Sequence, residues 1–510
     1  MTVRSIVKIS LTASVTLVTG SYLFEATNKV IAEENTENID SSASKTSNNF
    51  GFNGKIAVIG TGIGGASATH FIRKLLGNEV QIDVFEKNDH LGGRMHVVDV
   101  NGEQIESGGT IIHSSNRYVM VDFAKDLEMD TNIATDDAKL GIYNGKEFAF
   151  LQSSWKWLNI AKLMWRYGPF SLRNMDSALT KMLNDFVKIY DIQENEQAFR
   201  TVPEMLNALG GDYFVELTKK TSTQALKDEG IGDTLIQELI TGISRCNYGQ
   251  STDDVNGFTG FVSLAGAQEG ALWNVKDGNY KVPQTLIENS KANIRTNTKI
   301  TSIKRYERNS KVQYELEGAP NNESYDAIIV AAPLEVPSCF LDCTKCKNWP
   351  CREELQKYQK TIATFIQMPL NHEYFGVKCK EDMADVVITT DSKENVFSTV
   401  APQKTVKGVL TEPPVYKIFS REPLSDALVK QMFIVNSKNE NKTSSDRTVV
   451  SWLAYPHYSP PEKFLPFELD EGVFYVNAIE RAASAMEMSA IGGRNAALLA
   501  YHYLKGAPKK

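Results

Sequence analysis

The stretch Lys55-Ile56-Ala57-Val58-Ile59-Gly60-Thr61-Gly62-Ile63-Gly64-Gly65 decides the fold of the N-terminal part of this chain. Residues 55–59 form a nearly continuous apolar run, which is typical of a strand buried on both faces of a parallel sheet. Gly60, Gly62 and Gly65 follow with G-x-G-x-x-G spacing, and an apolar helical pattern continues to Leu75. These glycines permit a tight turn, close approach of the backbone to a pyrophosphate, and close packing of helix on strand.

The flanking segments make this pattern more specific than its spacing alone. A second strand is predicted from Gln81 to Phe85, and Glu86 follows it, 21 residues after Gly65. A carboxylate there accepts hydrogen bonds from ribose hydroxyls and repels an additional ribose phosphate. The helix start supplies N–H groups and a positive dipole end for the pyrophosphate. The predicted dinucleotide contacts are therefore Gly60, Gly62, Gly64, Gly65, Glu86 and Lys87.

Two further glycine turns distinguish among dinucleotides. Leu91-Gly92-Gly93-Arg94 follows Glu86, and Gly108-Gly109-Thr110 comes soon after. A Gly-Gly-Arg turn brings backbone and a guanidinium to the other side of a pyrophosphate. The turn resembles the FAD-binding pattern of amine oxidases and their relatives, which simple nicotinamide dehydrogenases lack. That resemblance implies FAD as the cofactor, with Gly93, Arg94, Gly109 and Thr110 as additional contacts.

Later segments are predicted to return to the nucleotide sheet. Residues 293–303 are predicted as one strand, residues 325–333 as a buried strand, and residues 473–476 as a last short strand. By the same resemblance, the backbone around Ile300 lies near the adenine. Glu480 precedes a predicted helix from 482 to 504, whose start is suited to the flavin pyrimidine ring. Met486 is a candidate ring contact or a core residue, and Gly492-Gly493 is expected to interrupt the helix.

Length and composition set the fold class. A chain of 510 residues is expected to form two intertwined domains, and a net charge of −7 argues against a nucleic-acid footprint or a polybasic membrane anchor. The predicted fold class is α/β, with a Rossmann-type FAD-binding domain of the glutathione-reductase/amine-oxidase kind and an α+β substrate domain. The FAD-binding parts are residues 53–110, 291–335 and 471–505. The substrate parts are a mostly helical segment, 111–290, and residues 336–470.

The N-terminus is interpreted as a secretory leader. Arg4 and Lys8 precede an apolar stretch, so residues 1–32 are predicted as a cleaved signal peptide and 33–52 as a disordered segment, with a signal-anchor or an unstructured tail as alternatives. Sequons at Asn322 and Asn441 favour glycosylation during secretory passage. The predicted location is therefore the lysosome or the outside of the cell.

Two further patterns leave alternatives open. Cys339, Cys343, Cys346 and Cys351 favour local disulfides over a structural zinc site, with free thiols as a third reading, and no metal ligand is assigned. The aromatic stretch from Trp155 to Tyr167 is interpreted as a packed helix, the wall of a pocket for an apolar ligand, or a helix on a membrane surface.

Several long segments together resemble the prenylcysteine oxidases, which are FAD-dependent thioether oxidases of the lysosome and secretory pathway. The resemblance extends from about residue 53 to about residue 505. Its most specific segments are residues 482–491, 495–502, 452–458 with 460–463, 163–168, 247–252 and 417–420.

The resemblance implies an activity and its partners. The substrate would be S-farnesyl- or S-geranylgeranyl-cysteine, whose allylic carbon beside sulfur passes a hydride to the flavin. Water then adds, and the hemithioacetal collapses to a prenyl aldehyde and cysteine, while molecular oxygen leaves as hydrogen peroxide. No nucleic acid and no stable transmembrane span are expected, although loose membrane association is.

Candidate catalytic residues are His113, His457 and Tyr455, each with a structural hydrogen-bonding role as the alternative. A flavin amine oxidase and a non-catalytic flavin- or lipid-binding relative are the competing functions.

Overall fold

The computed structural model describes residues 52–113, 116–133, 138–266, 272–308, 311–320, 323–346, 349–434 and 447–506. The predicted signal peptide, the polar segment that follows it up to Gly51, Asn322 and Asn441 lie outside the described residues.

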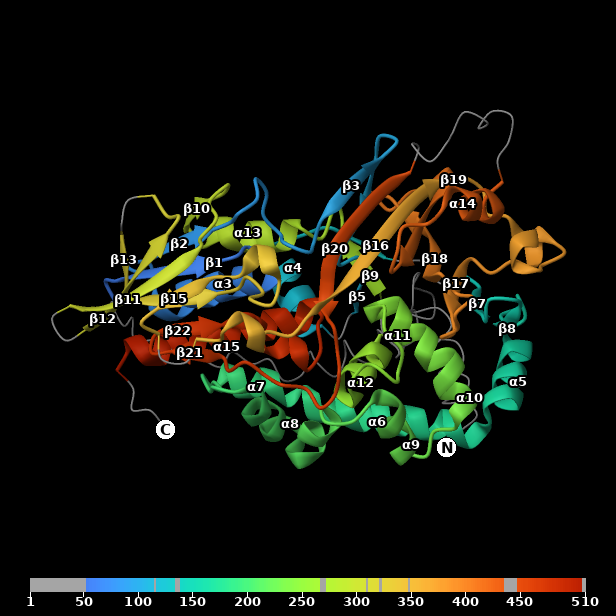
Figure 1. The fold of residues 1–510 in the computed structure, drawn as a ribbon, viewed down its shortest axis with the longest axis horizontal. Helices are drawn as coiled ribbons and strands as arrows, with labels where there is room; N and C mark the ends of the chain where they lie inside the picture. The colour runs from blue at the N-terminus through green and yellow to red at the C-terminus, as the bar shows by residue number, and fades with distance from the viewer. Residues whose placement is uncertain are drawn as a thin grey trace, which may run out of the picture.

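A six-stranded sheet forms the nucleotide-binding half of the molecule, at the left of Figure 1. Five of its strands are parallel, and only the edge strand β21 runs antiparallel to its neighbour. The order is β10 (Asn293–Arg295), β2 (Gln81–Phe85), β1 (Lys55–Ile59), β14 (Ala327–Val330), β22 (Val473–Tyr475) and β21 (Glu468–Asp470). The central strand β1 is apolar because both of its faces are covered: Ile56, Ala57 and Val58 are fully buried.

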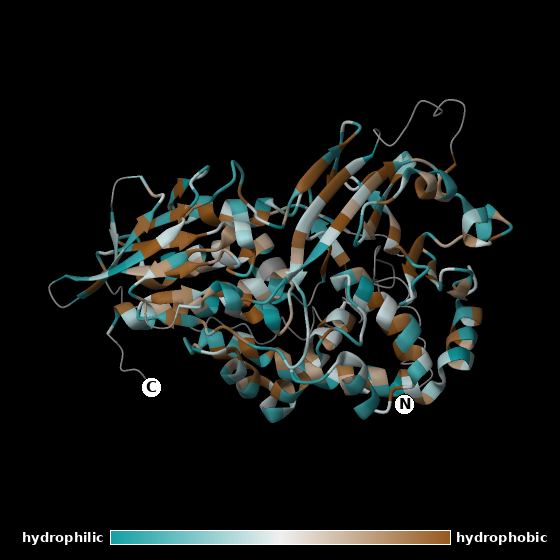
Figure 2. Ribbon diagram, in the orientation of Figure 1, coloured by the Kyte–Doolittle hydropathy of each residue, from teal (hydrophilic) through white to brown (hydrophobic). Residues whose placement is uncertain are grey.

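Three helices cover this sheet. Helix α3 (Ile63–Leu76) follows β1 directly and contacts both α13 (Lys281–Asn289) and α15 (Met486–Leu504). Figure 2 shows apolar residues gathered on the strands of this sheet. The predicted α/β fold with a Rossmann-type sheet is confirmed.

The segment predicted as one strand over residues 293–303 is two strands in different sheets. Asn297 has φ +51°, and it turns the chain between β10 and β11 (Ser302–Arg308). The N–H groups of Asn297 and Thr298 bond to the carbonyls of Asn88 and Glu86 at 2.8 Å each, which holds this turn against the end of β2. Strand β11 then joins a four-stranded sheet with β12 (Lys311–Glu317), β13 (Ser324–Tyr325) and β15 (Asp342–Thr344).

A seven-stranded sheet, at the centre and right of Figure 1, and a layer of helices along the bottom of the view form the second half. The sheet order is β20 (Thr448–Pro456), β16 (Tyr358–Gln367), β19 (Leu410–Ser420), β18 (Phe397–Lys404), β17 (Val386–Thr389), β7 (Leu140–Tyr143) and β8 (Phe148–Leu151). The helices are α5 (Lys156–Tyr167), α6 (Pro169–Phe186), α7 (Lys188–Glu194), α8 (Val202–Leu217), α9 (Ser222–Asp228), α10 (Asp233–Leu235), α11 (Thr241–Tyr248) and α12 (Gly257–Ala265).

The description of residues 111–290 as mostly helical holds only from residue 156 onward. Before that point the chain forms the short helical segments η1 (Arg117–Phe123) and α4 (Ala124–Asp126) and the strands β5 (Ile112–His113), β6 (Thr131–Ile133), β7 and β8, while β9 (Leu272–Val275) follows the helices. These strands were missed because they are short and pair with partners distant in sequence, as β5 and β6 do with β9.

Gly492 and Gly493 do not interrupt the last helix, so that expectation is wrong. Helix α15 is continuous from Met486 to Leu504. A Cβ on Gly493 would lie 2.2 Å from the carbonyl oxygen of Gly64, and one on Gly492 would lie 2.6 Å from that of Val476. Gly493 therefore lets α15 cross α3 at backbone contact, where the Ser67 hydroxyl also donates to the Ala490 carbonyl at 2.7 Å, while Gly492 lets α15 pack against the 3-10 helix η8 (Val476–Arg481).

Within the described residues, the structure forms one disulfide, Cys343–Cys346, which agrees with the preference for local disulfides in the cysteine cluster. The described part of the chain contains no group of three or more His, Cys, Asp or Glu side chains placed to hold a metal ion. None of the described helices has the length and apolar character needed to cross a membrane.

Candidate active site

The first glycine turn joins β1 to α3. Gly60 has φ +107°, and a Cβ on Gly65 would lie 2.0 Å from the Gly60 carbonyl oxygen, so the helix packs directly on the turn. At Gly62, by contrast, the only described atom within 4 Å of a Cβ would be the Gly93 Cα, at 4.0 Å. Helix α3 has no side-chain cap, and its first internal bond runs from the Ala66 N–H to the Gly62 carbonyl at 2.9 Å. The first-turn N–H groups are therefore available to an anion on an open side of the turn.

The second glycine turn lies against the first. Gly62 and Gly92 form a parallel β-bridge, and the Gly92 N–H donates to the Thr61 carbonyl at 3.2 Å. Gly92 and Gly93 have φ values of +113° and +59°, which residues other than glycine rarely adopt. Two backbones thus form a cradle with no intervening side chain, which suits a pyrophosphate.

Glu86 is buried at the end of β2. It accepts three hydrogen bonds: from the Thr61 N–H at 3.2 Å, the Thr61 hydroxyl at 2.5 Å, and the Asn88 N–H at 3.0 Å. A carboxylate has about four acceptor positions, so about one remains for a ribose hydroxyl. The turn that leads to Ile300 lies beside Glu86, because the Thr298 N–H donates to the Glu86 carbonyl. Lys87, by contrast, is exposed and donates to the Ser338 hydroxyl at 3.0 Å.

Arg94 and Glu480 are distant in sequence and pair in the structure. Two guanidinium nitrogens of Arg94 bond to the two carboxylate oxygens of Glu480, and one also donates to the Ala454 carbonyl at 2.8 Å. The Tyr358 hydroxyl donates to the same carboxylate at 2.8 Å. Burial opposes the charged form of Arg94, but the attraction of Glu480 outweighs it, and the net pKa of Arg94 is raised. The Arg94 side chain stays 35% exposed while that of Glu480 is 1% exposed, so Glu480 orients Arg94 without covering it.

The third glycine turn brings the remaining predicted cofactor contacts together. The Gly109 N–H donates to the Arg94 carbonyl at 3.1 Å, and a Cβ on Gly109 would lie 2.8 Å from the Met486 sulfur. Met486 is the first residue of α15. The predicted cofactor contacts therefore follow one another along a continuous line that β1, β2 and α15 position. They are Gly60, Gly62, Gly93, Arg94, Gly109, Thr110 and Met486.

Two buried ionisable residues beside Thr110, Lys417 and Glu106, were missed in the sequence. The Lys417 ammonium donates to the Glu106 carbonyl at 3.1 Å and to the Thr110 hydroxyl at 3.0 Å. Burial lowers the pKa of Lys417 to about 8, against the opposing charge of Glu106. Burial raises the pKa of Glu106 to about 7, although its carboxylate accepts a 2.6 Å bond from the Asn279 N–H. The second oxygen of Glu106 has no hydrogen-bond partner among the described residues.

A signal for Lys417 was present in the sequence. It lies in strand β19 between Val415 and Ile418, which are both fully buried. Lysine is almost never fully buried unless it has a partner, so a lysine in such a run indicates a polar site. Glu106 lies two residues before the third glycine turn but gave no comparable signal, because only the tertiary fold brings Asn279 and Lys417 to it.

The three candidate catalytic residues lie in different surroundings. His113 is buried on β5, three residues beyond Thr110. Tyr455 packs edge-to-face on Tyr248 at 5.3 Å and follows Ala454, the carbonyl partner of Arg94; burial raises its pKa to about 12. The His457 side chain is exposed and contacts the Gln359 amide oxygen at 2.9 Å. The structure therefore places Tyr455 near Arg94 and His457 at the surface.

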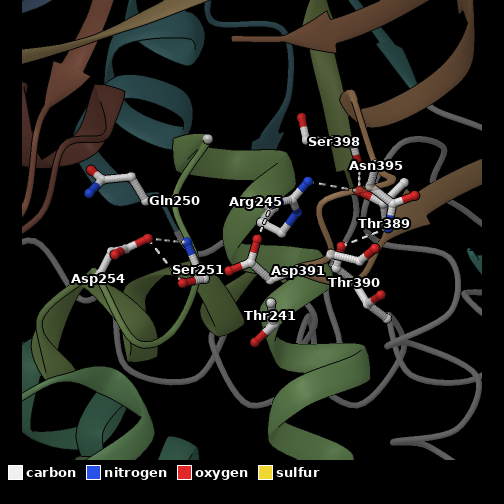
Figure 3. Close-up of polar contacts among 12 residues, drawn as sticks. Thr241, Arg245, Gln250, Ser251, Asp254, Thr389, Thr390, Asp391, Asn395 and Ser398 are labelled. Carbon is white, nitrogen blue, oxygen red and sulfur yellow. Dashed lines mark hydrogen bonds and ion pairs between the residues drawn. The ribbon is translucent and has the colours of Figure 1, made fainter. Parts of the chain in front are cut away.

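A second polar centre lies at the C-terminal part of α11 (Figure 3). Arg245 is buried and donates to Asp391 at 2.7 Å and to the Thr389 hydroxyl at 3.3 Å, which joins α11 to the end of β17. Next to it, the Gln250 amide exchanges two hydrogen bonds with the backbone of Tyr458, at 2.9 and 3.0 Å. The segment 247–252 therefore fixes the position of the chain between β20 and Glu480, the residue that orients Arg94.

Family models match two parts of the chain. Residues 150–510 match the prenylcysteine lyase family, and residues 58–127 match an NAD(P)-binding Rossmann-like domain.

Curated relatives match nearly the whole chain. Human prenylcysteine oxidase 1 (Homo sapiens) is 37% identical over 472 residues, covering 89% of this chain and 90% of the relative. Farnesylcysteine lyase of Arabidopsis thaliana is 36% identical over 466 residues, covering 87% of each. Human prenylcysteine oxidase 1-like is 31% identical over 461 residues, covering 88% of this chain and 90% of the relative.

Solved structures with a similar fold include amine oxidases. A putrescine oxidase with a redesigned cofactor-binding site has a TM-score of 0.58 at 12% identity, covering 87% of this chain and 98% of that structure. Cyclohexylamine oxidase from Brevibacterium oxydans has a TM-score of 0.54 at 13% identity, covering 89% and 100%. At such identities the likeness concerns the fold.

Proposed function

This chain belongs to the prenylcysteine lyase family, and from that premise we propose that it is an FAD-dependent oxidase that cleaves S-prenylcysteines. The observation that carries the proposal is the unbroken line of contacts from the pyrophosphate cradle at Gly62 to the buried Lys417. Through that line the nucleotide sheet meets the seven-stranded sheet, where a substrate can be held against a flavin.

The residues present fit FAD. The open backbone cradle at Gly62 and Gly93, the remaining acceptor position of Glu86 and the accessible guanidinium of Arg94 match a pyrophosphate and a ribose. When bound, FAD supplies a two-electron acceptor for the hydride of the allylic carbon next to sulfur, and molecular oxygen takes up those electrons as hydrogen peroxide. With one water the balance closes on a prenyl aldehyde and free cysteine.

The chain's own residues handle charge and protons at this site. Lys417, with a pKa near 8, holds a proton on its ammonium nitrogen and aims it at Thr110. Glu106, with a pKa near 7, is positioned by Asn279 and keeps one oxygen for water. Arg94 is oriented by Glu480 and remains partly exposed, so its guanidinium N–H groups are available to a negatively charged group of the cofactor. We assign His113 and Tyr455 to the lining of the same site, and retain His457 as a peripheral candidate.

The proposal extends to the cellular route. The leader at residues 1–32 and the sequons at Asn322 and Asn441 support secretory passage with glycosylation. We propose a lysosomal or extracellular location, where thioether remnants of prenylated proteins are degraded.

A visible spectrum of the purified protein tests the function. The protein is expected to carry a flavin absorbance that bleaches when farnesylcysteine is added without oxygen and returns, with peroxide, when oxygen is admitted. Putrescine and cyclohexylamine are the control substrates, and they should leave the spectrum unchanged. A colourless protein that takes up no added FAD would contradict the proposal, as would bleaching by the amines alone. Gly62→Val is the matched variant, expected to fold but to lose the flavin, because the added side chain occupies the cradle.

A further inference from the structure

Helix α5 has an apolar face on each side. Asn159, Ile160, Leu163 and Tyr167 are buried against the protein. On the outer side, Trp157 is 72% exposed, Leu158 48% and Trp165 93%. Trp155 before the helix and Phe170 in the first turn of α6 are 77% and 76% exposed. Exposed aromatic side chains gathered in this way usually mark a surface that contacts something else.

The aromatic side chains form one ridge. Trp157, Ala161 and Trp165 are spaced four residues apart, so they line up along the helix. Gly168, with φ +78°, turns the chain between α5 and α6 and places Phe170 after the ridge. In Figure 1, α5 lies at the outer edge of the molecule, at the end opposite the nucleotide sheet. The ridge therefore lies at the end of the molecule opposite the nucleotide-binding sheet.

The charge of this helix has the opposite sign to that of the whole chain. Helix α5 carries Lys156, Lys162 and Arg166 and no acidic residue, whereas the chain has a net charge of −7. Arg166 is neutralised by Glu238 through bonds of 2.6 and 2.7 Å. Lys156 is exposed, and Lys162 donates to the Leu151 carbonyl at 3.1 Å, so two lysines flank the ridge without a carboxylate partner in the described residues. This local charge complements a negative surface.

We infer that the outer face of α5, continued by Phe170, docks the protein on an anionic lipid surface. Tryptophan has an apolar ring with a polar N–H, and it favours the level of the lipid headgroups. The exposed Lys156 beside the ridge reaches the phosphates, Lys162 adds positive charge nearby, and the helix lies in the plane of the interface without crossing the bilayer. The inference stands on exposure and charge, and it is independent of the oxidase chemistry.

Vesicle sedimentation of the full chain tests the docking surface. Wild-type protein is expected to bind vesicles of 70% phosphatidylcholine and 30% phosphatidylserine, with a blue shift of tryptophan fluorescence. Binding to pure phosphatidylcholine should be weaker. The double variant Trp157→Ser/Trp165→Ser should reduce the partition coefficient by about tenfold or more. The matched control is Val409→Ser/Leu410→Ser, which changes residues that are 58% and 51% exposed at the start of β19 and just before it, and this variant should bind as wild type does.

Three results would overturn the inference: no vesicle binding by wild type, equal binding by the tryptophan variant, or equal loss in the control. A dimer by light scattering that becomes a monomer in the tryptophan variant, without vesicle binding, would instead assign this face to a second copy of the chain. Turnover of dissolved farnesylcysteine without vesicles should be unchanged in the tryptophan variant. Failure of the oxidase proposal would leave vesicle binding measurable, so the two tests are separate.

Discussion

Replacement of Gly493 by alanine tests the role of the helix crossing most directly. The new Cβ would lie 2.2 Å from the Gly64 carbonyl oxygen and 3.0 Å from the Ala68 nitrogen. Both neighbours are backbone atoms that cannot rotate away, so the cost of overpacking lies near the upper end of its usual range, about 3 kcal/mol. The higher helix propensity of alanine recovers about 1 kcal/mol. The expected net loss of unfolding free energy is therefore about 2 kcal/mol.

The assay is urea unfolding followed by circular dichroism, with FAD in excess. Gly64 belongs to the first glycine turn, so displacement of α3 should also weaken flavin binding in a fluorescence titration. Gly266→Ala is the matched control, because Gly266 has φ −65° and no described atom within 4 Å of its Cβ position. That variant should be as stable as wild type or slightly more stable. A Gly493→Ala protein with wild-type stability and flavin affinity would refute the argument that Gly493 exists for this crossing.

Three further outcomes follow from the buried charges. The pKa of Lys417 is lowered from 10.5 to about 8, so the unfolded chain binds more protons than the folded chain between these pH values. The stability of wild type should therefore rise relative to that of Lys417→Met as pH rises from 8 to 10.5. The pH profile of the turnover rate should also lose its inflection near pH 8 in this variant. The pKa of Glu106 is raised from 4.5 to about 7, so the folded chain binds more protons than the unfolded chain between these pH values. The stability of wild type should therefore fall relative to that of Glu106→Gln as pH rises from 4.5 to 7, measured by thermal unfolding at each pH. Arg94→Met leaves the buried Glu480 without its cation and should lower the free energy of unfolding by about 3 kcal/mol. This value is the low end for a broken buried pair, because the Arg94 side chain is itself 35% exposed. A denaturant unfolding curve equal to that of wild type would contradict this.

The sequence predicted the parts of the site that depend on local backbone constraints. The turns at Gly60, Gly62 and Gly92 require conformations or close approaches that side chains obstruct, so their pattern is visible without knowledge of distant residues. The apolar run of β1 was equally clear, because a strand buried on both faces leaves no polar alternation. The resemblance of long segments to a known family then indicated FAD and a thioether substrate, and the relatives support it.

What only the tertiary structure decided concerns contacts between residues hundreds of positions apart. The pairing of Arg94 with Glu480 and the bond from Lys417 to the Glu106 carbonyl depend on how the two sheets meet. Gly493 looked like a defect because helix propensity is local, whereas its purpose is the space it leaves for α3. The ridge of α5 had three readings because an apolar helix face has the same sequence whether a protein core or solvent lies beyond it. Which of two apolar helix faces is buried is therefore a property of the whole fold, and the local pattern of α5 does not encode it.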